Sequence, residues 1–198
     1  MGRSTAPGAP PAADAPAVVF LGDSLTAGYG LDPEQAYPAI IQRKIDEAGL
    51  RYRVVNAGVS GETSAGARRR LEWLLAQPVA VLVVETGAND ALRGQDPAAT
   101  ADNIQAIIDR ARREPSPPKV VLVGMEALPN YGADYGRRFH EIYPRLAKSN
   151  GVALVPFLLE GVGGVAALNQ ADGIHPTAEG QRRLAETVWK TLQPLLTG

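Results

Sequence analysis

The sequence predicts one three-layer α/β/α domain, in which helices cover both faces of a parallel β-sheet. Short runs of aliphatic, often β-branched residues alternate with longer segments in which apolar residues recur every three or four positions. The run at residues 79–84 is apolar throughout, which is typical of a strand buried on both faces. A chain of 198 residues is long enough for one such domain. Strands that alternate with helices form right-handed βαβ units, and these build a parallel sheet.

Five strands are expected, each a short run rich in valine, leucine or another apolar residue. They lie at residues 18–21, 52–57, 79–84, 120–123 and 152–155. Runs of this length are usual for strands in a buried sheet.

Five helices are expected between and after these strands. Tyr37-Pro38 opens the first, because proline is favoured in the first helical turn. Thr63 caps the second, and Asp96-Pro97 opens the third. The fourth, whose apolar stripe includes residues 139–146, is expected to bend at Pro144, and the last begins near Thr177.

The composition restricts which partners and sites are possible. A net charge of −1 gives no basic surface for nucleic acid, and no apolar run is long enough for stable membrane insertion. Without cysteine there is no disulfide, thiolate nucleophile or cysteine metal site. The sequence contains only two histidines, His140 and His175, so we expect no multi-histidine metal centre. His140 is expected at the surface.

Residues 1–16 consist largely of alanine, proline and other small residues, so we expect this segment to be disordered. The folded domain is then expected to span residues 17–198. No stretch of the segment resembles a signal peptide, but an Ala/Pro tract also suits the start of an exported protein whose signal has been removed.

The first strand leads directly into a polar pair, Asp23-Ser24, after Gly22. In open α/β sheets, ligands bind at the carboxyl ends of the strands, where this pair is expected. A helix that starts at Ser24 would direct its first N–H groups at the group that the hydroxyl attacks. Ser24 is therefore a candidate nucleophile. The alternative is that Asp23 or Ser24 only caps the helix.

Asp172 and His175 lie three residues apart before the last helix. A turn would let the carboxylate orient one imidazole nitrogen while the other faces Ser24, which makes a serine hydroxyl reactive. A capped turn is the alternative. Acyl transfer also needs donors for an oxyanion. The candidates are the N–H of Gly58, the side-chain amide of Asn89 and the N–H of Ser24, although Gly58 could serve only as a turn and Asn89 only as a cap.

Four blocks together resemble the signature of the SGNH (GDSL) hydrolases, within the thioesterase I/arylesterase/lysophospholipase branch. They are Gly22-Asp23-Ser24-Leu25, Gly58, Gly87-Ala88-Asn89-Asp90 and Asp172-Gly173-Ile174-His175-Pro176. The resemblance runs from about Val18 to the end of the chain.

The resemblance implies Ser24 as nucleophile, His175 as base, Asp172 as orienting acid, and Ser24, Gly58 and Asn89 in the oxyanion hole. It also implies a flavodoxin-like five-stranded sheet of order 2-1-3-4-5. We expect a monomer that needs no metal or cofactor and is exported to the periplasm or secreted, although a cytoplasmic location stays open. The expected substrates are short to medium acyl esters or thioesters. The expected substrate-binding residues are Asp23, Leu25, Asp90, Leu128, Pro129 and Tyr131.

Three other interpretations of the sequence compete with this one. The run Gly58-Val59-Ser60-Gly61 begins like the nucleophile elbow of the α/β-hydrolases. Glu62 stands where that motif requires glycine, so Ser60 is rejected as nucleophile. A flavodoxin-like nucleotide-binding module could use the 22–30 loop to hold phosphate, but the loop lacks both glycine signatures of such sites. A carbohydrate O-deacetylase would keep the catalytic residues and change only the substrate. The arginines at 68–70 and 182–183 are expected on solvated helix faces.

Overall fold

The computed structural model describes residues 14–198 and contains a five-stranded parallel sheet of order β2-β1-β3-β4-β5. The strands are β1 (Ala17–Gly22), β2 (Arg53–Gly58), β3 (Val79–Glu85), β4 (Lys119–Val123) and β5 (Ala153–Val155). The predicted fold class and strand order are therefore confirmed. Of the segment expected to be disordered, residues 1–13 lie outside the described residues, and the Pro16 carbonyl already accepts a hydrogen bond from Arg53 N.

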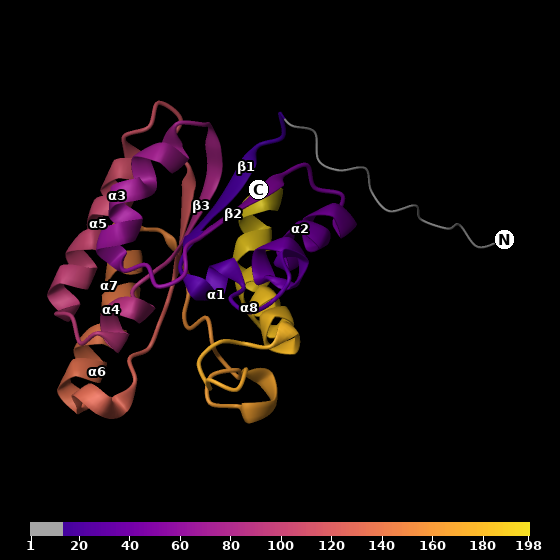
Figure 1. The fold of residues 1–198 in the computed structure, drawn as a ribbon. Helices are drawn as coiled ribbons and strands as arrows, with labels where there is room; N and C mark the ends of the chain where they lie inside the picture. The colour runs from indigo at the N-terminus through magenta and orange to yellow at the C-terminus, as the bar shows by residue number, and fades with distance from the viewer. Residues whose placement is uncertain (1–13) are drawn as a thin grey trace.

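Helices form a layer on each side of the sheet (Figure 1). One layer contains α3 (Ser64–Leu75), α5 (Pro97–Arg112) and α7 (Ile142–Asn150), and the other contains α2 (Tyr37–Glu47) and α8 (Ala178–Thr197). Three short helices lie toward the carboxyl ends of the strands, namely α1 (Ser24–Ala27), α4 (Ala88–Leu92) and α6 (Ala133–His140). The 3-10 helices are η1 (Pro33–Gln35), η2 (Pro129–Tyr131) and η3 (Ala166–Leu168).

Thr63 caps its helix as predicted, and two other predicted helix starts have caps of the same kind. Thr63, Asp96 and Thr177 each accept a backbone N–H of the first turn with their side chains. An N-cap of this kind typically contributes about 1 kcal/mol. The helices that flank the site therefore begin at positions that local sequence determines.

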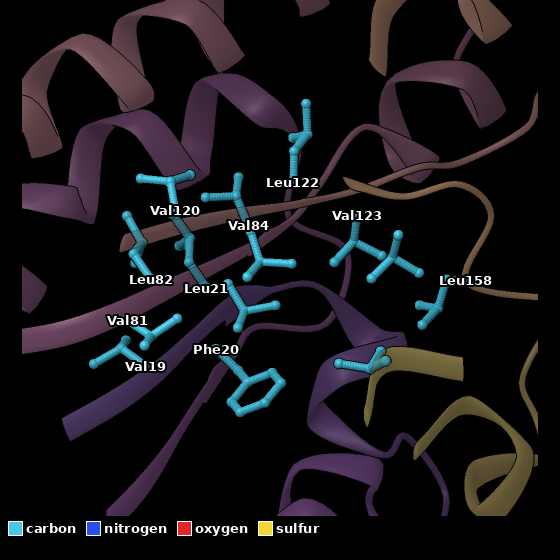
Figure 2. Packing of buried hydrophobic residues seen from close by; sticks show 14 of the residues in the cluster. Val19, Phe20, Leu21, Val81, Leu82, Val84, Val120, Leu122, Val123 and Leu158 are labelled. Carbon is cyan, nitrogen blue, oxygen red and sulfur yellow. The ribbon is translucent and has the colours of Figure 1, made fainter. Parts of the chain in front are cut away.

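The core lies between the sheet and its two helical layers. Residues 81–84 of β3 are at most 1% exposed, which agrees with the prediction that this strand is buried on both faces. Figure 2 shows side chains of β1, β3 and β4 packed side by side, with Leu158 beyond the end of β4. This packing fixes the strand ends from which the site is built.

Two local expectations need correction. The helix expected to bend at Pro144 is two helices, α6 and α7, which meet at Glu141. Pro144 has no N–H to donate to the His140 carbonyl four residues earlier, and its ring needs room there, so the helix breaks. The helix α4, which carries Asn89, was not expected. Its five residues are too few to show an apolar period.

Within residues 14–198, no helix combines the length and the apolar character that crossing a bilayer requires.

Candidate active site

Ser24, His175 and Asp172 form a continuous line of hydrogen bonds. The Ser24 Oγ lies 3.0 Å from His175 Nε2, and His175 Nδ1 lies 2.6 Å from Asp172 Oδ2. Ser24 begins α1 directly after β1, whereas the other two lie on the loop before α8. In this arrangement the serine hydroxyl donates to one imidazole nitrogen, and the other nitrogen donates to the carboxylate. This is the geometry in which imidazole can take the proton of an attacking hydroxyl.

Asp172 is held by its own loop. Its Oδ1 accepts the backbone N–H groups of Ile174 and His175, at 2.9 and 3.0 Å. The hydrogen bond from the His175 side chain, followed by these two, lowers the pKa of Asp172 to about 2. The carboxylate is thus ionised at any pH at which the imidazole could be neutral.

The tight turn before Ser24 depends on Gly22. A Cβ at this position would lie 2.0 Å from Thr26 Oγ1 and 2.7 Å from Glu85 Oε2, so only glycine fits. Asp23, which is 1% exposed, caps α1 because its Oδ1 accepts the N–H of Leu25 at 2.9 Å. The strand, the turn and the cap together hold Ser24 at the edge of the sheet.

The side chain of Asn89 is oriented by Asp23. Its Nδ2 donates to Asp23 Oδ2 at 3.2 Å, and only the amino end of an amide can donate to a carboxylate. One Nδ2 hydrogen remains, and Asn89 lines the cavity beside Ser24. Burial raises the pKa of Asp23 to about 6, although the hydrogen bonds from Leu25 and Asn89 oppose this shift.

Gly58 does not lie where an oxyanion donor is needed. Its N–H donates to Asn56 Oδ1 at 2.9 Å, and it does not line the cavity. A Cβ at this position would lie 2.3 Å from the backbone N of Ala27, so this glycine permits β2 to approach α1. The expectation for Gly58 is therefore corrected. Gly61 in the same loop lines the cavity with a φ of +79°.

The N–H groups of Gly61 and Ser24 are available to a ligand. Neither donates to a protein acceptor within residues 14–198. With the remaining Nδ2 hydrogen of Asn89, they are three candidate oxyanion donors on residues that line the same cavity. The three come from the ends of β1, β2 and β3.

The loop that carries Gly61 is held by Arg70, which is only partly exposed rather than on a solvated face as expected. Its guanidinium donates to both carboxylate oxygens of Glu62, at 2.7 to 2.9 Å. It also donates to the carbonyls of Gly22 and Ala57 at 3.1 and 2.6 Å. A planar guanidinium can satisfy several acceptors in this way.

A cavity of about 300 Å³ opens beside Ser24 and His175. Leu25 and Leu128, which were expected to contact substrate, both line it. Further apolar lining comes from Ala91, Leu92, Met125, Leu159 and Ile174. Gly163 and Gly164 form part of the wall.

Three residues expected to bind substrate do not line this cavity. Pro129 and Tyr131 lie on η2, and the Tyr131 hydroxyl donates to the Leu92 carbonyl at 3.2 Å. Asp90 is fully buried and accepts hydrogen bonds from the backbone and hydroxyl of Ser64 and from the Thr100 hydroxyl. These bonds tie α4 to α3 and α5. Asp90 does not line the cavity although Asn89 does, because successive residues of a helix face different sides.

Tyr29 and Ser60 are among the cavity residues to which the sequence assigned no role at the site. Tyr29 lies against the imidazole of His175, and Ser60 lines the cavity although it was rejected as nucleophile. The glycines at positions 28 and 30 around Tyr29 were the available signal for a tight, exposed turn at the site. His140 lies at the surface as expected, with its Nδ1 2.5 Å from Glu126 Oε1.

No group of three or more histidine, cysteine, aspartate or glutamate side chains in the described part of the chain could hold a metal ion.

Comparison with known proteins matches residues 20–183 to the GDSL-like lipase/acylhydrolase family. Esterase TesA of Pseudomonas aeruginosa is 47% identical over 185 residues, which cover 93% of this chain and 91% of that protein. Thioesterase 1/protease 1/lysophospholipase L1 of Escherichia coli is 40% identical over 187 residues, covering 93% and 87%. A crystal structure of TesA superposes with a TM-score of 0.86 at 46% identity, covering 91% of this chain and 99% of that one. Sequence and fold agree, and the chain belongs to the GDSL-like lipase/acylhydrolase family.

Proposed function

We propose that the protein is a serine ester hydrolase that cleaves short to medium acyl esters and thioesters through an acyl-enzyme. The observation that carries this proposal is the line from Ser24 through His175 to Asp172 at the mouth of an apolar cavity. Nucleotide binding would not require this hydrogen-bonded set of serine, histidine and aspartate. The names of the relatives, an esterase and a thioesterase/lysophospholipase, support the same reaction class.

In the first half of the reaction, Ser24 Oγ attacks the substrate carbonyl while His175 Nε2 takes the hydroxyl proton. The carbonyl π electrons move onto oxygen, and the N–H groups of Ser24 and Gly61 with Asn89 Nδ2 stabilise the resulting oxyanion. When the tetrahedral intermediate collapses, the C–O or C–S bond breaks and His175 returns the proton to the leaving group.

In the second half, water replaces the alcohol or thiol. His175 takes a proton from the water as its oxygen attacks the acyl carbon, and then gives that proton to Ser24 Oγ as the ester bond breaks. Asp172 remains ionised throughout and stabilises the imidazolium that forms twice.

The dimensions of the cavity support the substrate class. A volume of about 300 Å³ lies at the lower end of the range of roughly 300–1,000 Å³ for ligand pockets. Most of the surface that the wall exposes is apolar, with leucine, methionine and alanine among its residues, which suits an acyl chain better than a sugar. Each buried methylene contributes at most about 0.8 kcal/mol.

We further propose that one chain is sufficient for activity and that the protein works outside the cytoplasm. All the groups named in the reaction belong to one copy, and the resemblance to the thioesterase I branch supports export. Activity that scales linearly with dilution would support the first proposal. Fractionation of the native producing cells would test the second, and enzyme confined to the cytosol would overturn it.

Ser60 provides a matched control for the nucleophile, because both serines line the same cavity. Ser24→Ala should abolish nearly all hydrolysis of p-nitrophenyl butyrate, whereas Ser60→Ala should retain most of it. A phosphonate ester should label Ser24 in the wild type, as detected by peptide mass spectrometry. Labelling at Ser60, or full activity in Ser24→Ala, would overturn the proposal. A panel of acyl-CoA, lysophospholipid and acetylated sugars would then define the substrate, and a preference for the sugars would favour a deacetylase.

A further inference from the structure

The carboxyl group of Glu85 lies at the end of β3, beneath the turn that carries Ser24. The side chain is fully buried. Its Oε2 accepts the N–H of Asp23 at 3.0 Å and the hydroxyl of Thr26 at 2.8 Å. The Tyr37 hydroxyl lies 2.8 Å from Thr26 Oγ1, and it must be the donor there because the Thr26 hydrogen is directed to Glu85. Glu85 thus connects α1 and α2 to the end of the central strand.

The second carboxyl oxygen of Glu85 is unusual. Oε1 is buried and receives a hydrogen bond from no donor within residues 14–198. An ionised carboxylate with one unsolvated oxygen would be very costly at this depth. The Asp23 N–H bond to Glu85 Oε2 brings the two buried carboxyl groups close together, and two carboxyl groups that share a buried site cannot both be ionised without a large cost.

The surrounding contacts indicate which of the two carries a proton. Asp23 accepts from Leu25 N and from Asn89 Nδ2, and both bonds favour the carboxylate form. Glu85 is more deeply buried, and burial followed by the charge of Asp23 raises its pKa well above its usual range.

The other ionisable groups that face this pair favour the same assignment. The phenols of Tyr37 on α2 and Tyr143 on α7 have pKa values well above 10, raised mainly by burial, so they are neutral. When the imidazole of His175 is protonated during the reaction, its charge favours the ionised form of Asp23.

We propose that Glu85 is a positioning residue that is held as the neutral acid, donates its proton to the Asp23 carboxylate and thereby aligns Asn89 for the oxyanion. This proposal rests on the proposed function. The pair then carries one negative charge instead of two, and Asp23 can hold α1 and Asn89 at the same time. Ionising Glu85 would place two charges in contact and displace Asp23 from both partners.

Asp90, five residues further along, shows the contrast. It is also fully buried, but it accepts three hydrogen bonds, from Ser64 N, Ser64 Oγ and Thr100 Oγ1. A glutamine at position 85 can reproduce every bond of a protonated glutamate, because its amino group replaces the O–H. An asparagine at position 90 would place an amino group against a donor and lose at least one bond.

The first test is infrared difference spectroscopy at pH 8 of the wild type against Glu85→Gln. We expect the wild type to show the carbonyl stretch of a protonated carboxylic acid and Glu85→Gln to lack it. A wild type without this band, or a band of equal size in Glu85→Gln, overturns the proposal. This measurement does not depend on any activity, so it also separates failure of this inference from failure of the proposed function.

The second test is kinetic. Glu85→Gln should keep kcat and KM close to the wild type, whereas Glu85→Leu should lower kcat toward the roughly 10²-fold loss of an oxyanion donor with KM little changed. Equal loss of kcat in both variants would show that an ionised Glu85 is needed and overturn the proposal. Thermal unfolding would check both folds. Should Glu85→Leu not fold, Glu85→Gln compared with Asp90→Asn decides, with a larger loss of stability expected in Asp90→Asn.

Discussion

The ring of Tyr29 lies against the imidazole of His175, with the ring centroids 4.5 Å apart and the planes inclined by 39°. The backbone reinforces this contact, because Gln170 Nε2 donates to the Tyr29 carbonyl at 2.8 Å and so joins the loop after α1 to the loop before α8. Tyr29 thus covers one face of the base while its own side chain remains half exposed.

Tyr29→Ala should therefore lower kcat by at most roughly tenfold. An aromatic pair contributes about 0.5–1.5 kcal/mol, and 1.36 kcal/mol corresponds to tenfold in rate. Tyr29→Phe keeps the ring and should retain the wild-type kcat. The measurement is hydrolysis of p-nitrophenyl butyrate. Equal loss in both variants would show that the hydroxyl, and not the ring, matters.

Asn89→Ala should lower kcat by roughly 10²–10³-fold, or about 3–4 kcal/mol, because one side-chain donor to the oxyanion is lost. KM should change little, since the donor acts mainly on charge that develops in the transition state. Steady-state kinetics on an activated ester would show this. A raised KM with kcat unchanged would make Asn89 a substrate-binding residue and place the oxyanion elsewhere.

Two glycines in one loop should respond differently to alanine. At Gly61 a Cβ would meet only an Arg93 nitrogen at 3.9 Å, so Gly61→Ala should fold, but its φ of +79° is strained for alanine and the N–H should turn away. We expect lower kcat with a small change in Tm. Gly58→Ala would meet the Ala27 backbone at 2.3 Å and should mainly lower Tm. Loss of kcat without loss of Tm in Gly58→Ala would restore Gly58 as the donor.

The acid side of the pH profile should be steeper than one proton would cause. His175 must be neutral to act as base, and Asp23, whose pKa burial raises to about 6, must be ionised to hold Asn89. Protonation of Asp172 does not contribute to this part of the profile, because the His175 hydrogen bond lowers the pKa of Asp172 to about 2. The slope of log kcat/KM against pH should therefore approach two below about pH 6. A slope of one throughout would contradict the role of Asp23.

Asp23→Asn provides the control. The folded-state pKa of about 6 exceeds the ordinary 3.8, so ionised Asp23 destabilises the fold above about pH 6, and this cost disappears as the pH falls toward 3.8. Asp23→Asn places an amino group against a donor, which costs stability at every pH, but its free energy of unfolding relative to the wild type should rise by up to ~3 kcal/mol between pH 3.8 and pH 8. It should also reduce kcat and return the acid slope to one. Urea unfolding at the two pH values would measure the difference.

Chain length should show an optimum. Gly163 and Gly164 contribute little surface to their part of the cavity wall, so each added methylene should yield less than the roughly 0.8 kcal/mol of full burial. We expect kcat/KM on p-nitrophenyl esters of two to sixteen carbons to peak at short to medium chains. A steady rise to the longest ester would indicate a long, closed tunnel instead.

The sequence predicted the sheet, its order and most helices because these depend on apolar runs, caps and a family signature. It assigned the oxyanion donor to Gly58 and overlooked Gly61, since both lie close together in sequence and only the backbone path determines which of them lines the cavity. Asp90 was misassigned because its neighbour Asn89 faces the cavity while Asp90 turns toward α3. Glu85 had no assigned role, since nothing in the neighbouring sequence shows that its carboxyl group is buried beneath that of Asp23.

Arg70 also has a consequence for how the site responds to heat. It joins the carbonyls at the ends of β1 and β2 to Glu62, which lies beside Gly61. The N–H groups of Ser24 and Gly61 are therefore anchored to the same pair of strand ends, so their separation should stay fixed while the sheet is folded. On heating, these two donors should be lost only when the sheet melts, so any earlier inactivation would have to begin in the separate loop that carries Asp172 and His175.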